Sequence, residues 1–232
     1  MPIHVRAKPE DIAPIVFLPG DPTRAQMIAE NFMQDPVCYT DYRHMYGYTG
    51  SYKGLRFSVQ TTGMGGPSAA IVCEELAQLG AKFFIRIGSC GSLQPNIELS
   101  DLILASTACP MDGTSNEIFG RTGFAPNSNF VFLRRCIEYA ENHDFRAHVG
   151  PVASVDCFYG PSEDFFEQLK RYGILAIEME ASTVLTIAAK YGLRGAALFC
   201  VSDIVHEKKR ASDEKIWEGV RRMIEMGLQA AQ

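Results

Sequence analysis

The sequence has neither an excess of positive charge nor a long apolar run. Its 27 acidic residues outnumber its 22 lysines and arginines, which gives a formal net charge of -5 at pH 7. This balance offers no electrostatic basis for binding nucleic acid. No apolar stretch approaches the roughly 20 residues that cross a bilayer, and residues 1–6 lack the apolar core of a signal peptide. We therefore expect a cytoplasmic protein with no nucleic acid partner and no membrane anchor.

The cysteines lack the spacing of a metal site or of a disulfide framework. There are seven of them, an odd number, and no two form a Cys-x-x-Cys pair. Most lie among apolar residues, where cysteine behaves as a small hydrophobic side chain. Cys90 is the exception, because its glycine and serine neighbours place it in a candidate ligand site. We predict that the protein binds no metal ion.

The chain also lacks linkers and internal repeats, so we expect one domain over residues 1–232. An apolar fraction of 47% is enough for a substantial core. Strand-like and helix-like patterns alternate along the whole sequence, which is typical of α/β proteins. We predict an α/β fold in which a central mixed, largely parallel sheet is flanked by helices.

The expected elements follow from periodicity and from capping residues. Strands are expected at 14–20, 37–62 (as antiparallel strands), 83–87, 97–106, 147–154, 173–180 and 195–203. Helices are expected at 22–31, 67–79, 129–142 and 181–191, from 212 onward, and after Ser162, which caps an acidic first turn. Residues 109–128 are predicted to form the longest loop, and a loop of that length is more often functional than filler.

Residues 83–92 are the stretch around which the predicted site is organised. They begin as an apolar run, typical of a buried strand, and Arg86 inside that run needs an anion. The glycines at 88 and 91 are expected to let the chain turn tightly and present backbone N–H groups and a hydroxyl to a ligand. The pattern indicates a phosphate site, although a structural salt bridge of Arg86 would explain it equally well.

A second corner suited to anions begins at Gly20. This glycine ends an apolar strand, and Asp21 then caps a predicted helix whose N-terminal amides favour negative charge. Arg24 lies in the first turn of that helix, where the helix dipole disfavours a cation. A bound anion would account for Arg24, and so would a surface salt bridge to Asp21.

Carboxylates end two further apolar strands. Glu178 and Glu180 close one of them and Asp203 closes another. Buried carboxylates need partners, which helix amides or ligand hydroxyls could supply. Ligands of such sheets bind beyond the carboxyl ends of the strands. The convergence of these acids with Gly20 and Arg86 therefore favours a ligand site, in which desolvation is expected to keep Asp203 as a neutral acid.

The sequence resembles the bacterial hexameric purine nucleoside phosphorylases, whose subunits are of low molecular mass, over nearly its whole length. Any one matching segment is weak evidence, but all of them in this order are strong. The segments are 18–24, 46–54, 62–68, 86–91, 158–159, 177–181 and 201–203.

The resemblance implies a role for each matching position. Phosphate would be bound by Gly20, Arg24, Arg86 and Ser89, and by Arg43 of a neighbouring subunit, although Arg43 alone looks like a solvated charge. The nucleoside would be bound by His4 from across the same interface, Met64, Cys90, Gly91, Phe158, Glu178, Met179, Glu180 and Ser202. Asp203 would face N7 of the purine as the catalytic acid.

The activity implied by the resemblance is reversible phosphorolysis of purine ribonucleosides and 2′-deoxyribonucleosides to free base and (2-deoxy)ribose 1-phosphate. Inorganic phosphate is a co-substrate, and no metal or organic cofactor is needed. The implied assembly is a hexamer built as a trimer of dimers with shared active sites. The family usually has an arginine shortly after the aspartate. Here Arg210 and Lys215 lie near that place and neither aligns with it, so the preference between 6-oxo and 6-aminopurines stays open.

Other functions fit the sequence less well. A nucleosidase of the same superfamily would use water and has no need of three phosphate arginines. A uridine phosphorylase would be expected to place Gln and Arg near Phe158, and a methylthioadenosine phosphorylase remains a further alternative within the superfamily. A methyltransferase would leave Arg86 misplaced, and a nucleoside-binding protein without catalysis would not need Asp203.

Overall fold

The computed structural model describes residues 2–120 and 123–232. Its strands are β1 (Ile15–Pro19), β2 (Gln34–Thr40), β3 (Gly47–Tyr52), β4 (Leu55–Gln60), β5 (Phe83–Ser92), β6 (Leu102–Met111), β7 (Ala147–Val155), β8 (Ala176–Glu178), β9 (Arg194–Ile204) and β10 (Lys209–Arg210). Its helices are α1 (Pro22–Phe32), α2 (Gly66–Gln78), α3 (Gly113–Phe119), α4 (Phe130–Asn142), α5 (Glu163–Arg171), α6 (Ala181–Lys190) and α7 (Asp213–Ala231), with short 3₁₀ turns η1 (Pro9–Asp11), η2 (Tyr42–His44) and η3 (Val205–Glu207).

The described strands form one mixed sheet in the order β10-β9-β6-β7-β8-β5-β1-β4-β3-β2. Parallel pairing links β4, β1, β5 and β9, while β2, β3 and β4 form an antiparallel edge. Because β5 pairs with β9 as well as with β8, the strands β5, β8, β7, β6 and β9 close into a ring. The predicted α/β fold with a mixed sheet and flanking helices is confirmed.

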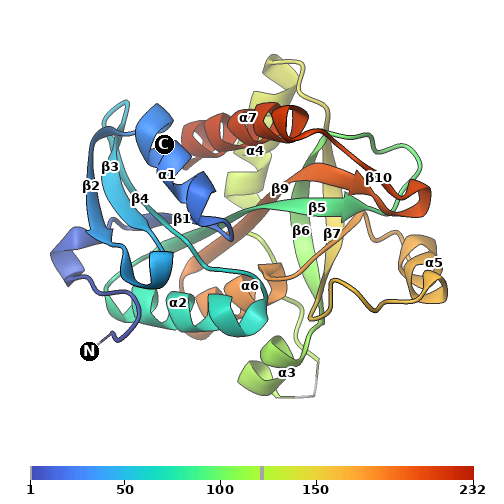
Figure 1. Ribbon diagram of the computed structural model, residues 1–232, viewed down its shortest axis with the longest axis horizontal. Helices are drawn as coiled ribbons and strands as arrows, with labels where there is room; N and C mark the ends of the chain where they lie inside the picture. The colour runs from blue at the N-terminus through green and yellow to red at the C-terminus, as the bar shows by residue number, and fades with distance from the viewer. Residues whose placement is uncertain (1, 121–122) are drawn as a thin grey trace.

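Helices cover both faces of the sheet, as Figure 1 shows. α1, α4 and α7 pack on one face, and α2 and α6 pack on the other. Strand β1 serves both faces: Phe17 belongs to the core under α1, α4 and α7, whereas Val16 and Leu18 face α2 and α6. This burial on both sides explains why β1 is apolar along its whole length. In the described ranges we find no helix with the length and apolar character that a membrane crossing requires.

Helix starts agree closely with the capping residues in the sequence. Asp21 accepts a hydrogen bond from the Thr23 N–H, Ser162 accepts one from Phe165, and Ser212 accepts one from Lys215. Each cap satisfies an N–H group that the first turn leaves without an intrahelical partner. These boundaries depend on local chemistry alone.

The prediction of a tight turn within residues 88–91 is wrong. β5 continues to Ser92, with one register shift between Cys90 and Gly91. The glycines there allow close packing: a Cβ atom at Gly88 would lie 2.9 Å from both the Phe199 ring and Arg86 Nη2, and one at Gly91 would lie 2.8 Å from Val205 Cγ2. The small residues thus serve contact with β9 and with the segment that follows it.

Two further boundaries differ from the prediction. The strand expected at 97–106 is β6, which begins at Leu102 and runs to Met111 because it pairs with β7 along most of that length. The predicted loop at 109–128 contains helix α3, capped by Asp112. Residues 121 and 122 of that loop lie outside the described residues.

Gly219 on α7 sets how closely this helix approaches β9. A Cβ atom at position 219 would lie 2.3 Å from Cys200 Sγ. We expect Gly219→Ala to lower the free energy of unfolding by roughly 1–3 kcal/mol through overpacking, partly offset by the higher helix propensity of alanine.

Urea denaturation of four chains tests this account of the contact: wild type, Gly219→Ala, Cys200→Ala and the double variant. Removing Sγ makes room for the new methyl group, so Gly219→Ala is expected to be neutral or stabilising in the Cys200→Ala background. An equal loss in both backgrounds would contradict the account.

Candidate active site

The candidate site lies where four strands end close together. β5 is paired with β1 on one side and with β8 and β9 on the other. The register places Arg86 beside Leu18 of β1, and Gly91 beside both Ile177 of β8 and Asp203 of β9. Side chains from distant parts of the sequence therefore meet near the ends of these strands. Figure 1 shows β5 and β9 lying side by side.

Arg86 is the centre of the buried polar network, with only 4% of its surface exposed. Its Nη1 donates to the carbonyl oxygens of Leu18 at 3.2 Å and Ile87 at 3.3 Å, and its Nη2 donates to Glu180. Its Nε lies 3.9 Å from Glu178 Oε2 and makes no hydrogen bond. The salt bridge that the sequence left open for Arg86 is present, and one buried donor of the guanidinium is still unsatisfied.

Arg24 brings a second buried guanidinium to the same place. Its Nη1 donates to the Ile87 carbonyl at 3.5 Å, and its buried Nε has no hydrogen-bond partner. Burial and then the charge of Arg86 lower the pKa of Arg24. Asp21 caps α1 through Thr23, and the alternative of a salt bridge between Asp21 and Arg24 is not found among the described residues. Two buried arginines with spare N–H donors are an arrangement that an anion would satisfy.

The backbone at Gly20 approaches the arginines closely and has no side chain there. A Cβ atom at Gly20 would lie 3.0 Å from the Gly63 carbonyl oxygen and 3.5 Å from Arg86 Nη1. Ser89 is half-buried on β5, one strand residue past Gly88. Gly20, Arg24 and Arg86 thus lie together, as predicted, and Ser89 follows on the same strand.

Glu178 and Glu180 have different partners although they are two residues apart. Glu178 accepts hydrogen bonds from Ser154 Oγ and from the amides of Glu180 and Ala181, at the start of α6. Glu180 accepts from Arg86 and, at 2.6 Å, from the Gly65 N–H. Burial, followed by the charge of Glu180, raises the pKa of Glu178 to about 7. Glu178 therefore braces the strand–helix junction, whereas Glu180 lies against Arg86.

Asp203 is less buried than its apolar strand led us to expect, with 30% of its side chain exposed. Ser202 Oγ donates to Asp203 Oδ2 at 2.6 Å and reaches the Cys90 carbonyl at 3.2 Å. Arg210 Nη1 donates to both carboxylate oxygens, at 3.1 and 3.0 Å, because β10 pairs antiparallel with β9 and brings the two residues opposite each other. Of the two candidate helper residues, the structure places Arg210, not Lys215, on Asp203.

Three predicted nucleoside contacts are apolar side chains that are exposed or half-buried. Met64 and Phe158 expose 85% and 67% of their surface, and Met179 is half-buried beside Glu180. Met64 is held between Gly63 and Gly65, and the Gly65 amide is the one bound to Glu180. Met64 and Met179 are thus adjacent in sequence to groups of the Glu180 network, whereas the described contact of Phe158 is with Tyr159.

His4 and Arg43 are not part of this cluster. His4 contacts Glu75 of α2, and Arg43 follows Tyr42, whose ring lies 3.4 Å from the Arg6 guanidinium carbon. The N-terminal segment and η2 are therefore neighbours, and neither His4 nor Arg43 has a described contact with Arg86. The prediction that both residues act in another subunit stays a prediction.

Sequence reasoning missed Ser154. Its hydroxyl donates a hydrogen bond to Glu178, so it belongs to the same buried network as the predicted residues. It also accepts the Ser182 N–H at 2.9 Å. The signal was available, because Ser154 closes the predicted strand at 147–154 in the same way that Asp203 closes another.

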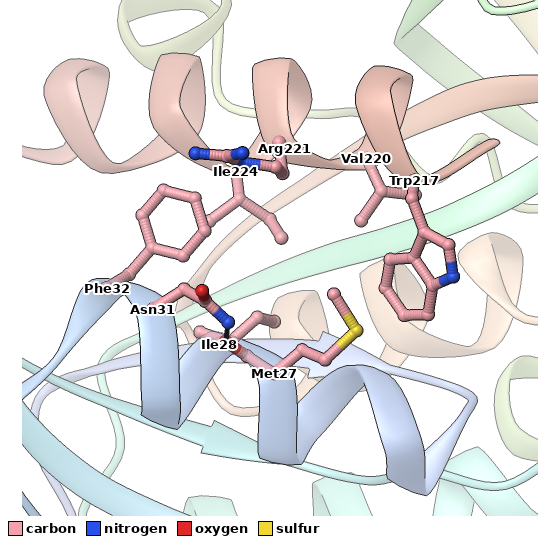
Figure 2. Close-up of a pocket in the computed structure, with 8 residues that line it drawn as sticks. All are labelled: Met27, Ile28, Asn31, Phe32, Trp217, Val220, Arg221 and Ile224. Carbon is pink, nitrogen blue, oxygen red and sulfur yellow. Dashed lines mark hydrogen bonds between the residues drawn. The ribbon is translucent and has the colours of Figure 1, made fainter. Parts of the chain in front are cut away.

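A hollow of about 150 Å³ lies between α1 and α7, as Figure 2 shows. It is lined mainly by apolar side chains, and none of the predicted site residues lines it.

Comparison with known proteins gives a consistent answer over the full chain. The sequence profile of the Phosphorylase superfamily matches residues 14–227, so the chain belongs to this superfamily. It is 42% identical to a protein of Clostridium novyi (strain NT) named "Purine nucleoside phosphorylase DeoD-type", over 100% of both chains. It is 41% identical to proteins of the same name from Bacillus cereus (strain B4264) and Bacillus mycoides (strain KBAB4), over 100% of this chain and 99% of theirs.

Proposed function

We propose that this protein is a purine nucleoside phosphorylase that reversibly converts purine ribonucleosides and 2′-deoxyribonucleosides to free base and (2-deoxy)ribose 1-phosphate. The full-length similarity to relatives of that name supports the assignment. The observation that carries it is the pair of buried guanidinium groups of Arg24 and Arg86, each with an unsatisfied Nε, at the ends of parallel strands. Inorganic phosphate is the co-substrate, and the reaction needs no metal or organic cofactor.

The phosphate half of the site consists of Gly20, Arg24, Arg86 and Ser89, completed by Arg43 of the partner subunit. Gly20 allows a ligand oxygen to approach the backbone, and the guanidinium groups supply donors in a fixed planar arrangement. Holding the anion beside C1′ of the sugar provides both position and electrostatic stabilisation.

The sugar half adjoins it through the Arg86–Glu180 ion pair. Glu180 accepts hydrogen bonds from ribose hydroxyls, Met64 and Met179 pack on the sugar, and Glu178 braces the junction that positions Glu180. His4 of the partner subunit reaches the far end of the sugar. Because Glu180 is shared between Arg86 and the sugar, the phosphate and nucleoside halves meet at one carboxylate.

The base lies toward Asp203, with Phe158 on its face and Cys90, Gly91 and Ser202 along its edge. In the reaction the C1′–N9 bond breaks with its electron pair moving to the purine, and a phosphate oxygen forms the new bond to C1′. The leaving purine takes a proton at N7. Asp203 in its acid form donates this proton from a carboxyl oxygen and becomes a carboxylate, while Ser202 and Arg210, which contact the carboxyl group, hold it in place.

We propose that the protein works in the cytoplasm as a hexamer made of three dimers. The absence of described contacts between His4 or Arg43 and the Arg86 cluster of the same chain supports sites shared between subunits. The exposed apolar side chains of Met64 and Phe158 support a site that is covered only when a ligand and a second subunit are present.

A phosphorolysis assay tests the assignment. With inosine or adenosine, free base and ribose 1-phosphate should form in equal amounts, and only when phosphate is added. Arg86→Ala should raise the phosphate KM at least about tenfold and lower kcat, since phosphate is both ligand and nucleophile. The matched control is Arg134→Ala, at an exposed position of α4, which should leave both constants unchanged.

Base release that is independent of phosphate would identify a nucleosidase and overturn the proposal. Release from uridine or methylthioadenosine in preference to purine nucleosides would reassign the substrate within the superfamily. Wild-type phosphate kinetics in Arg86→Ala would remove this arginine from the phosphate site.

The role of Asp203 as acid predicts a dependence on the substrate. Asp203→Asn keeps the shape of the side chain and removes its acidic proton, so kcat for natural purine nucleosides should fall roughly 10²–10⁴-fold. 7-Methylguanosine already carries positive charge on its imidazole ring and should lose much less. Asp213→Asn, in the exposed first turn of α7, is the matched control. An equal loss on both substrates would make Asp203 a structural or positional residue.

A further inference from the structure

Glu75 of α2 holds the N-terminal segment by three consecutive backbone amides. The Ile3 N–H donates to Oε1 at 3.0 Å, the His4 N–H donates to Oε2 at 2.9 Å, and the Val5 N–H donates to Oε2 at 2.6 Å. Burial raises the pKa of Glu75, but the hydrogen bonds from Val5, His4 and Ile3 outweigh it, and the pKa lies below its usual value. The carboxylate is therefore ionised, and it fixes where this segment leaves the fold.

The same carboxylate also binds the His4 ring. His4 Nδ1 lies 2.9 Å from Glu75 Oε1, while the two side chains are 35% and 11% exposed. An ionised carboxylate only accepts hydrogen bonds, so Nδ1 carries the hydrogen. In the neutral form of the ring, Nε2 then keeps an acceptor lone pair. Nδ1 and Nε2 lie on opposite sides of the ring, which leaves Nε2 free to accept from a hydroxyl.

We propose that Glu75 is a positioning residue for the site of the partner subunit, where it orients His4 so that Nε2 accepts a hydrogen bond from the 5′-hydroxyl of the bound nucleoside. This inference rests on the proposed function, because it takes the nucleoside as substrate and the site as shared. Three amide bonds would suffice to anchor the segment. The fourth contact acts on a half-exposed ring and gives that ring one orientation and one tautomer.

The arrangement also selects among substrates by their 5′ group. A 5′-hydroxyl can donate to Nε2. A 5′-phosphate is an anionic acceptor, and it would meet the Nε2 lone pair with the Glu75 charge behind it. A 5′-deoxy substrate has nothing to donate. Glu75 would therefore be among the residues that set the preference for a 5′-hydroxyl.

The test compares inosine with 5′-deoxyinosine, or adenosine with 5′-deoxyadenosine if wild type prefers 6-aminopurines. Glu75→Gln exchanges one acceptor oxygen for a donor. It should lower kcat/KM for the 5′-hydroxyl substrate roughly tenfold, mainly by raising KM, because a loss of this size corresponds to one hydrogen bond that involves a charged group. For the 5′-deoxy substrate the change should be about twofold or less. The matched control is Glu74→Gln on the same helix, since Glu74 pairs with Lys190 and Tyr191 and should leave both substrates unaffected.

A double-variant cycle separates action through His4 from general loosening of the chain. In the His4→Ala background, Glu75→Gln should add about twofold or less, because the group through which it acts is absent. An equal loss on both substrates in Glu75→Gln, or full additivity with His4→Ala, would overturn the proposal and make Glu75 purely structural.

Two outcomes keep this inference distinct from the proposed function. Failure of wild type to release base with phosphate would reject the proposed function itself. Phosphate-dependent activity in which His4→Ala does not distinguish the two substrates would reject only the role of Glu75. If Glu75→Gln does not fold, ¹⁵N NMR of histidine in the wild-type protein decides between the two tautomers: hydrogen on Nδ1 of His4 is expected, and hydrogen on Nε2 alone would contradict the proposal.

Discussion

The buried ion pair between Arg86 and Glu180 is the interaction on which the rest of the site depends. A guanidinium inside a sheet is strongly destabilising unless charge and hydrogen bonds compensate for lost water. Here the compensation comes from three directions: the Leu18 carbonyl of β1, the Ile87 carbonyl of β5 itself, and Glu180 at the start of α6. These contacts tie two strands and a helix together at the point where a ligand would enter.

The same ion pair explains how one residue can serve structure and binding at once. Removing either partner would leave an uncompensated buried charge, so each holds the other in place. A phosphate ion offers Arg86 a new partner, and ribose hydroxyls offer Glu180 new donors. Under the proposed function, phosphate therefore contacts Arg86 and ribose contacts Glu180, the two members of one buried ion pair.

Much of the fold could be predicted from the sequence because its boundaries are set locally. Asp21, Ser162 and Ser212 begin helices through their own side chains, and the apolar stripe of α7 follows from helical spacing alone. The extension of β6 to Met111 and the continuation of β5 through Gly88 could not be predicted in this way. They depend on pairing with β7 and on the packing of Phe199, which lie far away in the sequence.

The candidate site shows the same division. The rule that ligands bind at the ends of parallel strands predicted that Gly20, Arg86, Glu180 and Asp203 lie together. The first three are neighbours in the structure, whereas Asp203 lies beside Gly91, farther along β5. Which residue pairs with which could not be predicted. Arg210 reaches Asp203 only because β10 folds back on β9, and Glu178 turns away to Ser154 because α6 begins beside β7. The contacts of His4 likewise depend on a glutamate 71 residues away.

Because Glu180 contacts Arg86 and would also accept hydrogen bonds from ribose, phosphate and nucleoside should bind cooperatively, and calorimetry measures this coupling. Phosphate affinity should be measured alone and in the presence of a nucleoside analogue with a C-glycosidic bond that cannot be cleaved. Our account predicts that the analogue tightens phosphate binding at least about fivefold, within the usual range of coupling between two sites, and that Glu180→Gln removes most of this effect. Phosphate affinity that is the same with and without the analogue in the wild-type protein would contradict it.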